Sequence, residues 1–353
     1  MQETEKFEAG SPSDSAVTNY DAMSKIYLDV DPLEKSKVHR VLVCGALLFF
    51  TVSSTLCTQA SKSTDGSYAY NTFVIPFVAE SLKFFISIGL ELVYGSKEAE
   101  FDVQRFLRFS IPASCYFISN NCMFYIIKEL GGVTFQVTNN LKIISTGLLM
   151  QLFLRRRLRW SQWKSLVILA VGCAVTQLKV CDFSDTRLSV DRNAMERGFG
   201  YAMILMNAFA SGAGGVISEI LLKGSRQQVS IHRQNAQLYF FGAAFGIVAI
   251  RQNSSFESMY VRNEYSYSII SIFDGFNLFA YAAILSLAAS GLFVSIVLKY
   301  MDNFVKCFVA AVSMLLVAMC DMLIWNEPPT LQFFLGVTLT CIALEQYYFS
   351  YES

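Results

Sequence analysis

Apolar residues in this chain gather in long runs, and polar residues interrupt those runs at only a few positions. A run of roughly 20 apolar residues is long enough to cross a bilayer as a helix. The pattern predicts an all-α polytopic membrane protein with ten transmembrane helices. They are expected at residues 41–60, 73–94, 106–127, 133–154, 160–178, 198–222, 236–250, 275–299, 304–325 and 330–348.

The order of polar features is similar in the two halves of the chain. Placing residues 160–178 over residues 330–348 puts Gln162 on Gln332 and Lys306 beside Gln136. Inverted repeats with an odd number of helices build many secondary transporters, which bind substrate near the midplane between the halves. The sequence therefore predicts a five-plus-five inverted repeat, with repeats at about residues 41–178 and 198–348 of a domain at residues 38–350.

The cations predict the orientation of the chain. They gather before the first predicted helix, between the fourth and fifth, and between the sixth and seventh: Lys35, Lys37, Arg40, Arg155, Arg156, Arg157, Arg159, Lys223, Arg226 and Arg233. Short cytoplasmic loops carry an excess of Lys and Arg, so both termini are expected in the cytoplasm. Residues 1–37 are polar and are predicted to be a disordered cytoplasmic tail. Asn253 begins a glycosylation sequon on the opposite side, and the sequence leaves its modification open.

Composition argues against several functions. The 28 basic and 28 acidic residues cancel, so there is no electrostatic case for nucleic acid. Most of the nine cysteines fall in apolar runs, where packing is the expected role. His39 and His232 are the only histidines, and no phosphate-binding glycine loop or nucleophile elbow occurs. We therefore expect no enzyme activity, metal or cofactor.

Lys142 is the main functional candidate, because a charge within a membrane helix is costly and usually serves a purpose. At helical spacing it shares a face with Thr138 and, less closely, Phe135. An aromatic ring, a hydroxyl and an ammonium suit a base, a ribose and a phosphate. The alternative is an acidic partner from another helix.

Further polar groups lie inside or at the ends of the runs. Each has a structural alternative: an ion pair, a bond between helices, close packing, or cations reaching the membrane surface. They are Glu80 with Lys83, Asn120 with Asn121, residues 211–215 followed by Glu219, and residues 299–303 followed by Lys306.

Several short segments resemble motifs of the nucleotide-sugar transporter family, in its CMP-sialic acid, UDP-galactose and UDP-N-acetylglucosamine branch within the drug/metabolite transporter superfamily. Residues 135–142, FQVTNNLK, resemble FQVTYQLK, and residues 299–303, KYMDN, resemble KYxDN, with Lys306 as its following lysine. Residues 215–219 resemble GVYFE, and residues 235–239 resemble the end of RNIQLY. Asn120 with Asn121 resembles an NN pair, and Glu80 with Lys83 resembles the pair in EVIK.

The resemblance implies a ten-helix antiporter that exchanges a cytosolic nucleotide sugar for a lumenal nucleoside monophosphate across the Golgi or endoplasmic reticulum membrane. It implies that Lys142 and Lys299 flank the phosphates and that Lys62 helps to hold the sugar. The implied nucleotide pocket, with the acidic and basic pair of the second helix, comprises Asn120, Asn121, Phe135, Thr138, Ser211, Asn235, Tyr239, Glu80 and Lys83.

Departures from the family pattern bear on the substrate. Asn139 and Asn140 replace Tyr-Gln, Gln234 replaces an arginine, and Ile217 and Ser218 replace two aromatic residues. Residues 138–142, TNNLK, and residues 328–332, PPTLQ, resemble plant-type members that handle UDP-N-acetylhexosamines, with UDP-galactose and CMP-sialic acid left open. Two alternatives are an exporter of the same fold with a non-nucleotide substrate and a scaffold that has lost transport. Gly242 and Gly246 have the GxxxG spacing of helix contacts, which is compatible with a homodimer.

Overall fold

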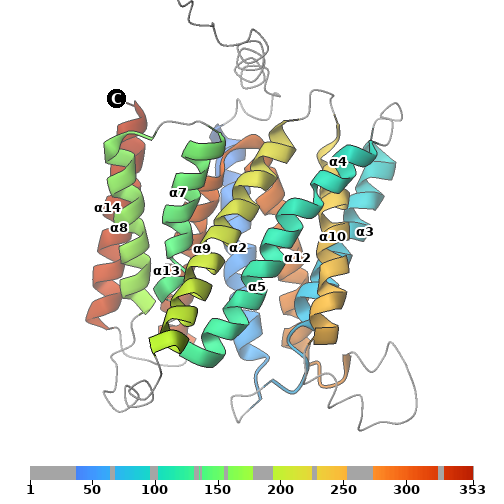
Figure 1. The fold of residues 1–353 in the computed structure, drawn as a ribbon, viewed down its shortest axis with the longest axis horizontal. Helices are drawn as coiled ribbons and strands as arrows, with labels where there is room; N and C mark the ends of the chain where they lie inside the picture. Colours follow the sequence, from blue (N-terminus) through green and yellow to red (C-terminus); the bar gives the residue numbers. More distant parts are fainter. Residues whose placement is uncertain are drawn as a thin grey trace, which may run out of the picture.

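The computed structural model describes residues 37–63, 68–95, 102–130, 135, 137–154, 158–177, 194–224, 229–252, 273–324 and 330–352. Every multi-residue regular element within these ranges is an α-helix, and the longer helices lie side by side in one bundle (Figure 1). The helices are α2 (Lys37–Ala60), α3 (Val74–Tyr94), α4 (Val103–Arg108), α5 (Ser110–Leu130), α7 (Leu141–Phe153), α8 (Trp160–Gln177), α9 (Ala194–Lys223), α10 (Ile231–Gln252), α12 (Leu278–Tyr300), α13 (Asn303–Ile324) and α14 (Leu331–Glu352).

Four of these helices are long and apolar enough to cross a membrane: α2, residues 199–223 of α9, α12 and α13. Large apolar side chains also point outward, as Phe49 (65 % exposed), Leu92 (82 %) and Leu323 (80 %) show. An extensive apolar outer surface suits lipid rather than water. The all-α, multi-pass membrane class is therefore confirmed, while the count of ten spanning helices and the inverted repeat stay predictions. The tail at residues 1–36 and the Asn253 sequon lie outside the described residues.

Some predicted helices differ from the structure at their boundaries. The run at residues 106–127 is divided into α4 and α5 at Phe109, and Asp102 begins α4 by accepting hydrogen bonds from the backbone N–H groups of Gln104 and Arg105. The predicted helix at residues 236–250 is longer, because α10 begins at Ile231. Its polar first turn was excluded by hydropathy, but Gln234 and Asn235 are buried there against other helices.

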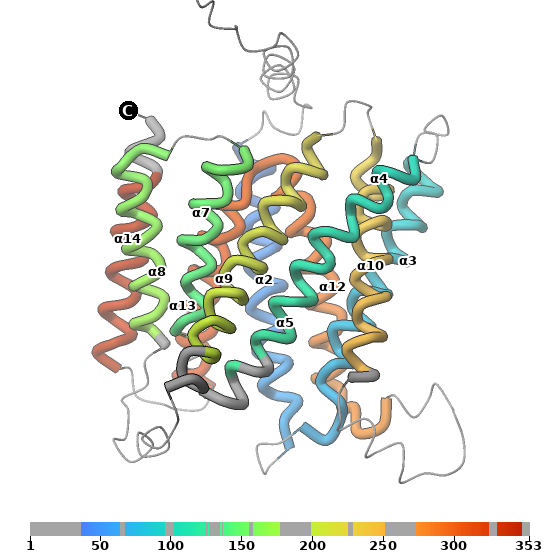
Figure 2. Tube along the Cα trace, viewed as in Figure 1, coloured from blue at the N-terminus to red at the C-terminus, as the bar shows by residue number. Residues whose placement is uncertain are grey.

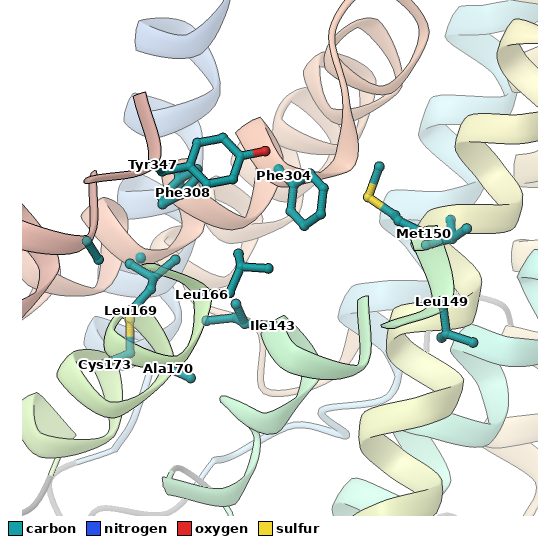
Figure 3. Close-up of a cluster of buried hydrophobic side chains, with 13 residues drawn as sticks. Ile143, Leu149, Met150, Leu166, Leu169, Ala170, Cys173, Phe304, Phe308 and Tyr347 are labelled. Atoms are coloured by element: carbon teal, nitrogen blue, oxygen red, sulfur yellow. The ribbon is translucent and has the colours of Figure 1, made fainter. Parts of the chain in front are cut away.

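The largest apolar core lies between α7, α8, α13 and α14. Its buried side chains include Ile143, Leu169, Phe304, Phe308 and Tyr347 (Figure 3). The rings of Phe308 and Tyr347 meet edge to face with centroids 4.8 Å apart. α8 and α14 pack against each other at the left edge of the bundle, as drawn in Figures 1 and 2.

Two glycines permit the close approach of α8 and α14. A Cβ on Gly336 would overlap Thr176 Oγ1 and lie 2.8 Å from the Gly172 carbonyl oxygen, and a Cβ on Gly172 would lie 2.9 Å from that of Leu339. Thr176 Oγ1 already donates to the Gly172 carbonyl, at 2.7 Å. Neither helix has room for a larger side chain at this crossing.

We expect Gly336→Ala to destabilise the protein, because overpacking a filled contact costs about 1–3 kcal/mol. Thermal unfolding of the detergent-purified protein measures this as a lower Tm. Gly89→Ala is the matched control, since a Cβ there meets nothing within 4 Å. A Gly336→Ala protein as stable as the Gly89→Ala protein would contradict the close packing.

The GxxxG spacing on α10 faces α3 of the same chain. A Cβ on Gly242 would lie 2.8 Å from Glu80 Oε2, and a Cβ on Gly246 would lie 3.1 Å from the Phe77 ring. The motif thus serves an internal helix contact. The homodimer stays a prediction, and the GxxxG spacing does not support it, because both glycines face α3 of the same chain.

Candidate functional site

Helices α5, α7, α9 and α13 bring two lysines together. The cationic neighbour of Lys142 on α7 is Lys306 on α13, with Cys307 beside both. Lys306 Nζ lies 5.7 Å from the centroid of the Tyr116 ring on α5, and that ring packs against Gly214 on α9. We call Tyr116, Lys142, Lys306 and Cys307 the lysine cluster.

The lysine cluster has no direct ion pair among the described residues, although Glu219 interacts electrostatically with Lys306. Within the described residues, no carboxylate lies within salt-bridge distance of Lys142 or Lys306. Both lysines are half-buried. Like charges held close in a poorly solvated place destabilise each other, and a bound anion relieves that cost. The acidic partner considered for Lys142 from another helix is therefore not found among the described residues.

Lys299, the second predicted phosphate ligand, has other partners. Its ammonium donates to Gln234 Oε1 at 3.2 Å and to the Val229 carbonyl at 3.3 Å. Gln234 is fully buried, and its Nε2 donates to the Leu222 carbonyl at the end of α9, at 3.2 Å. A second cation at position 234, where the family pattern has arginine, would repel Lys299, whereas the neutral amide accepts its hydrogen bond. The hydrogen bond between Lys299 and Gln234 therefore gives a physical reason for glutamine at position 234.

Glu219 is the centre of a second charged group. It is 1 % exposed, accepts from Lys223 Nζ at 2.7 Å, and accepts from the backbone N–H of Asn303 at 3.0 Å. Asn303 begins α13, where the helix dipole favours a negative charge. Lys223 also donates to the Met301 carbonyl that follows α12. Glu219 is therefore a buried connection between α9 and the α12–α13 junction.

Glu80 and Lys83 form the expected ion pair on α3, with 2.5 Å between Oε1 and Nζ. Lys83 is buried, and its Nζ lies 4.4 Å from the centroid of the Tyr239 ring on α10. The Tyr239 hydroxyl bonds to Ser295 Oγ at 2.7 Å and donates to the Gly291 carbonyl on α12 at 3.0 Å. The ion pair that was the structural alternative is therefore present, and it lies beside a predicted pocket residue.

The helix predicted at residues 133–154 is interrupted before Lys142. α7 begins at Leu141, and Asn139 and Asn140 form a turn in which Lys142 and Ile143 bond to carbonyls three residues back. Such bonds wind the chain about 20° further per residue than an α-helix does. The turn therefore changes the direction of Lys142 relative to Thr138 from that in a continuous α-helix. It lies at Asn139 and Asn140, the pair that departs from the family motif.

The remaining predicted residues lie at several places. Asn120 and Asn121 are exposed on α5. Thr138 Oγ1 donates a hydrogen bond to the Phe135 carbonyl at 3.3 Å. The Phe135 side chain packs on Cys122, Ile126 and Ile204. Ser211 is half-buried on α9, and Asn235 is buried with its Oδ1 lacking a hydrogen-bond partner. Lys62 is exposed, and its Nζ lies 5.7 Å from the centroid of the Tyr68 ring.

The sequence did not predict Tyr116 as a site residue, nor that Lys306 lies beside Lys142. The one available signal was the alignment of Lys306 with Gln136 between the two halves of the chain.

Comparison with known proteins bears on the whole chain. A family model described as "Nucleotide-sugar transporter" matches residues 35–348. A protein named CMP-sialic acid transporter 1 from Arabidopsis thaliana is 32 % identical over 313 residues, covering 87 % of this chain and 88 % of that protein. A protein named UDP-N-acetylglucosamine transporter from Homo sapiens is 31 % identical over 318 residues, covering 85 % and 92 %.

A solved structure titled "Crystal structure of protein" shares the fold, with a TM-score of 0.63. It covers 88 % of this chain and 96 % of its own, at 12 % identity, so the likeness extends to the fold alone. The sequence matches carry the assignment further, because they span most of the chain. This chain belongs to the nucleotide-sugar transporter family.

Proposed function

We propose that this protein is an antiporter that exchanges a cytosolic pyrimidine nucleotide sugar for a lumenal nucleoside monophosphate across the Golgi or endoplasmic reticulum membrane. The observation that carries the proposal is the lysine cluster, in which Lys142 and Lys306 lie together with no carboxylate paired to either among the described residues. A phosphate group is the ligand that this charge arrangement favours.

The same charges give a reason for exchange rather than one-way transport. An empty site would carry two neighbouring ammonium groups through any closed state, whereas a bound nucleotide neutralises them. Loaded protein would therefore change its orientation more readily than empty protein, in either direction. Lys306 takes the second phosphate contact in this proposal, in place of Lys299.

Other residues complete the proposed pocket. Asn120, Asn121, Phe135, Thr138, Ser211, Asn235 and Tyr239 are proposed to contact the nucleoside, with Glu80 and Lys83 behind Tyr239. The buried Asn235 Oδ1 without a partner supports a donor on the ligand. Lys62 is proposed to contact the sugar. The substrate we favour is a UDP-N-acetylhexosamine, with UDP-galactose and CMP-sialic acid as the other members of the panel below.

Proteoliposomes test the exchange directly. Vesicles preloaded with UMP, with CMP, or with buffer alone are offered radiolabelled UDP-, CMP- and GDP-sugars, and initial uptake is measured. We expect preloading with one monophosphate to accelerate uptake of the matching sugar nucleotide. Equal uptake by loaded and empty vesicles would contradict exchange. Thermal unfolding of the purified protein tests the alternative. A Tm raised by amines and not by nucleotides would indicate an exporter with a non-nucleotide substrate.

A further inference from the structure

A cavity of about 280 Å³ lies between α3, α4 and α10, helices that do not carry the lysine cluster. Its walls are almost entirely apolar: Phe84 and Ile88 from α3, Ala236 and Phe240 from α10, and Phe106 from α4. These helices lie together at the right of the bundle in Figure 1, with α4 at the upper end. The proposed transport function makes no use of this cavity.

The cavity has the shape of a slot with one charged end. Phe84, Ile88 and Glu91 follow each other at helical spacing on α3, and Arg233 and Phe240 do so on α10. Seven residues of helix span about 10 Å, so the slot reaches that far from its charged mouth into the apolar zone. Phe240 is 43 % exposed, which shows that the slot opens on the outer surface, where lipid chains lie.

The charged mouth contains buried polar atoms without partners. Arg233 Nε donates to Glu91 Oε1 at 3.2 Å, but Glu91 Oε2 has no hydrogen-bond partner. Gln237 Oε1, which also lines the cavity, lacks one too. Arg105 Nη2 is buried without a partner, and this guanidinium interacts electrostatically with Arg233. Arg105 does not itself line the cavity, so the mouth offers two acceptors without partners and the Arg233 guanidinium, with the Arg105 donor next to Arg233.

We propose that this slot is a binding site for phosphatidylethanolamine. The phosphate accepts hydrogen bonds from Arg105 and Arg233, and the primary ammonium donates to Glu91 and Gln237. One acyl chain lies along Phe84 and Phe240. Phosphatidylcholine offers the same phosphate, but its quaternary nitrogen has no N–H to donate. Phosphatidic acid offers a phosphate and no ammonium at all.

The test uses the purified full-length protein, stripped of lipid in detergent. Each of the three lipids, with identical acyl chains, is titrated while the bound lipid is counted by native mass spectrometry. We expect phosphatidylethanolamine to half-saturate the protein at a concentration about tenfold lower than phosphatidylcholine or phosphatidic acid does, the effect of one charge-assisted hydrogen bond. Equal half-saturation by all three lipids would overturn the proposal.

Variants separate the site from general surface charge. Glu91→Leu, which removes the acceptor, should reduce the preference over phosphatidylcholine without weakening phosphatidic acid, and Arg105→Gln should weaken all three lipids. Because each preference is a ratio measured within one variant, a general loss of stability does not imitate it. Arg108→Gln is the matched control, an exposed cation on the same short helix. A preference that is unchanged in Glu91→Leu, or is lost in Arg108→Gln, would overturn the assignment.

Discussion

Replacing Lys306 with glutamine is expected to lower the initial rate of nucleotide-sugar uptake by about tenfold or more, and Lys142→Gln should do the same. Each variant removes one charge-assisted hydrogen bond to a phosphate, worth about 1.5–3 kcal/mol. At 1.4 kcal/mol for each tenfold, that loss is about 10- to 150-fold in binding. Uptake into proteoliposomes at equal reconstituted protein measures it.

The double variant tests whether the two lysines act on one ligand. If both hold the same phosphate groups, Lys142→Gln combined with Lys306→Gln should lose less than the sum of the two single losses. Additive losses would place the two lysines at separate sites. Lys306→Gln with unchanged uptake would remove Lys306 from the proposed pocket altogether.

Lys299→Gln is the matched control for this experiment. Its ammonium is already bonded to Gln234 and Val229, so a much smaller effect on uptake is expected than for Lys306→Gln. A loss as large as that of Lys306→Gln would instead return the phosphate contact to Lys299, as the resemblance to KYxDN implied.

Replacing Glu219 with alanine is expected to destabilise the protein severely. The change leaves the Asn303 N–H without its acceptor and takes the carboxylate from Lys223. Breaking a buried charged pair by removing one partner costs about 3–5 kcal/mol. At a few degrees per kcal/mol, the Tm should fall by on the order of 10 °C.

Two comparisons make the Glu219 result specific. Glu345→Ala on α14 removes an exposed carboxylate and should leave the Tm nearly unchanged. Lys223→Ala combined with Glu219→Ala should cost less than the two single changes together, because the second change no longer leaves a charge unpaired. Losses that simply add would show that the pair contributes no coupling between α9 and the α12–α13 junction.

Much of the chain could be interpreted without its structure. Long apolar runs had to become membrane helices, because an unpaired backbone in lipid is too costly. Lys142 was identifiable as a functional candidate because few other charges lie within the runs. Short motifs then indicated the family, which the comparison confirmed. These features are local, since each depends on residues close together in the sequence.

Other features depended on contacts across long separations. Whether Lys306 or Lys299 lies beside Lys142 depends on how α13 packs against α7, and hydropathy contains no information on that distance. Gln234 is compatible with Lys299 only because α10 and α12 approach at that point. The turn at Asn139 and Asn140 could not be predicted from the pattern of apolar residues. That pattern does not show whether a backbone N–H bonds to the carbonyl three or four residues back.

The sequence by itself therefore determined the membrane class, the family and the presence of buried cations, because composition and short-range spacing suffice for each. Only the tertiary structure decided which cations lie together, which have ion-pair partners, and where an apolar cavity opens between α3 and α10. Charge interactions act over a few ångströms, so their partners depend on which helices the fold brings into contact.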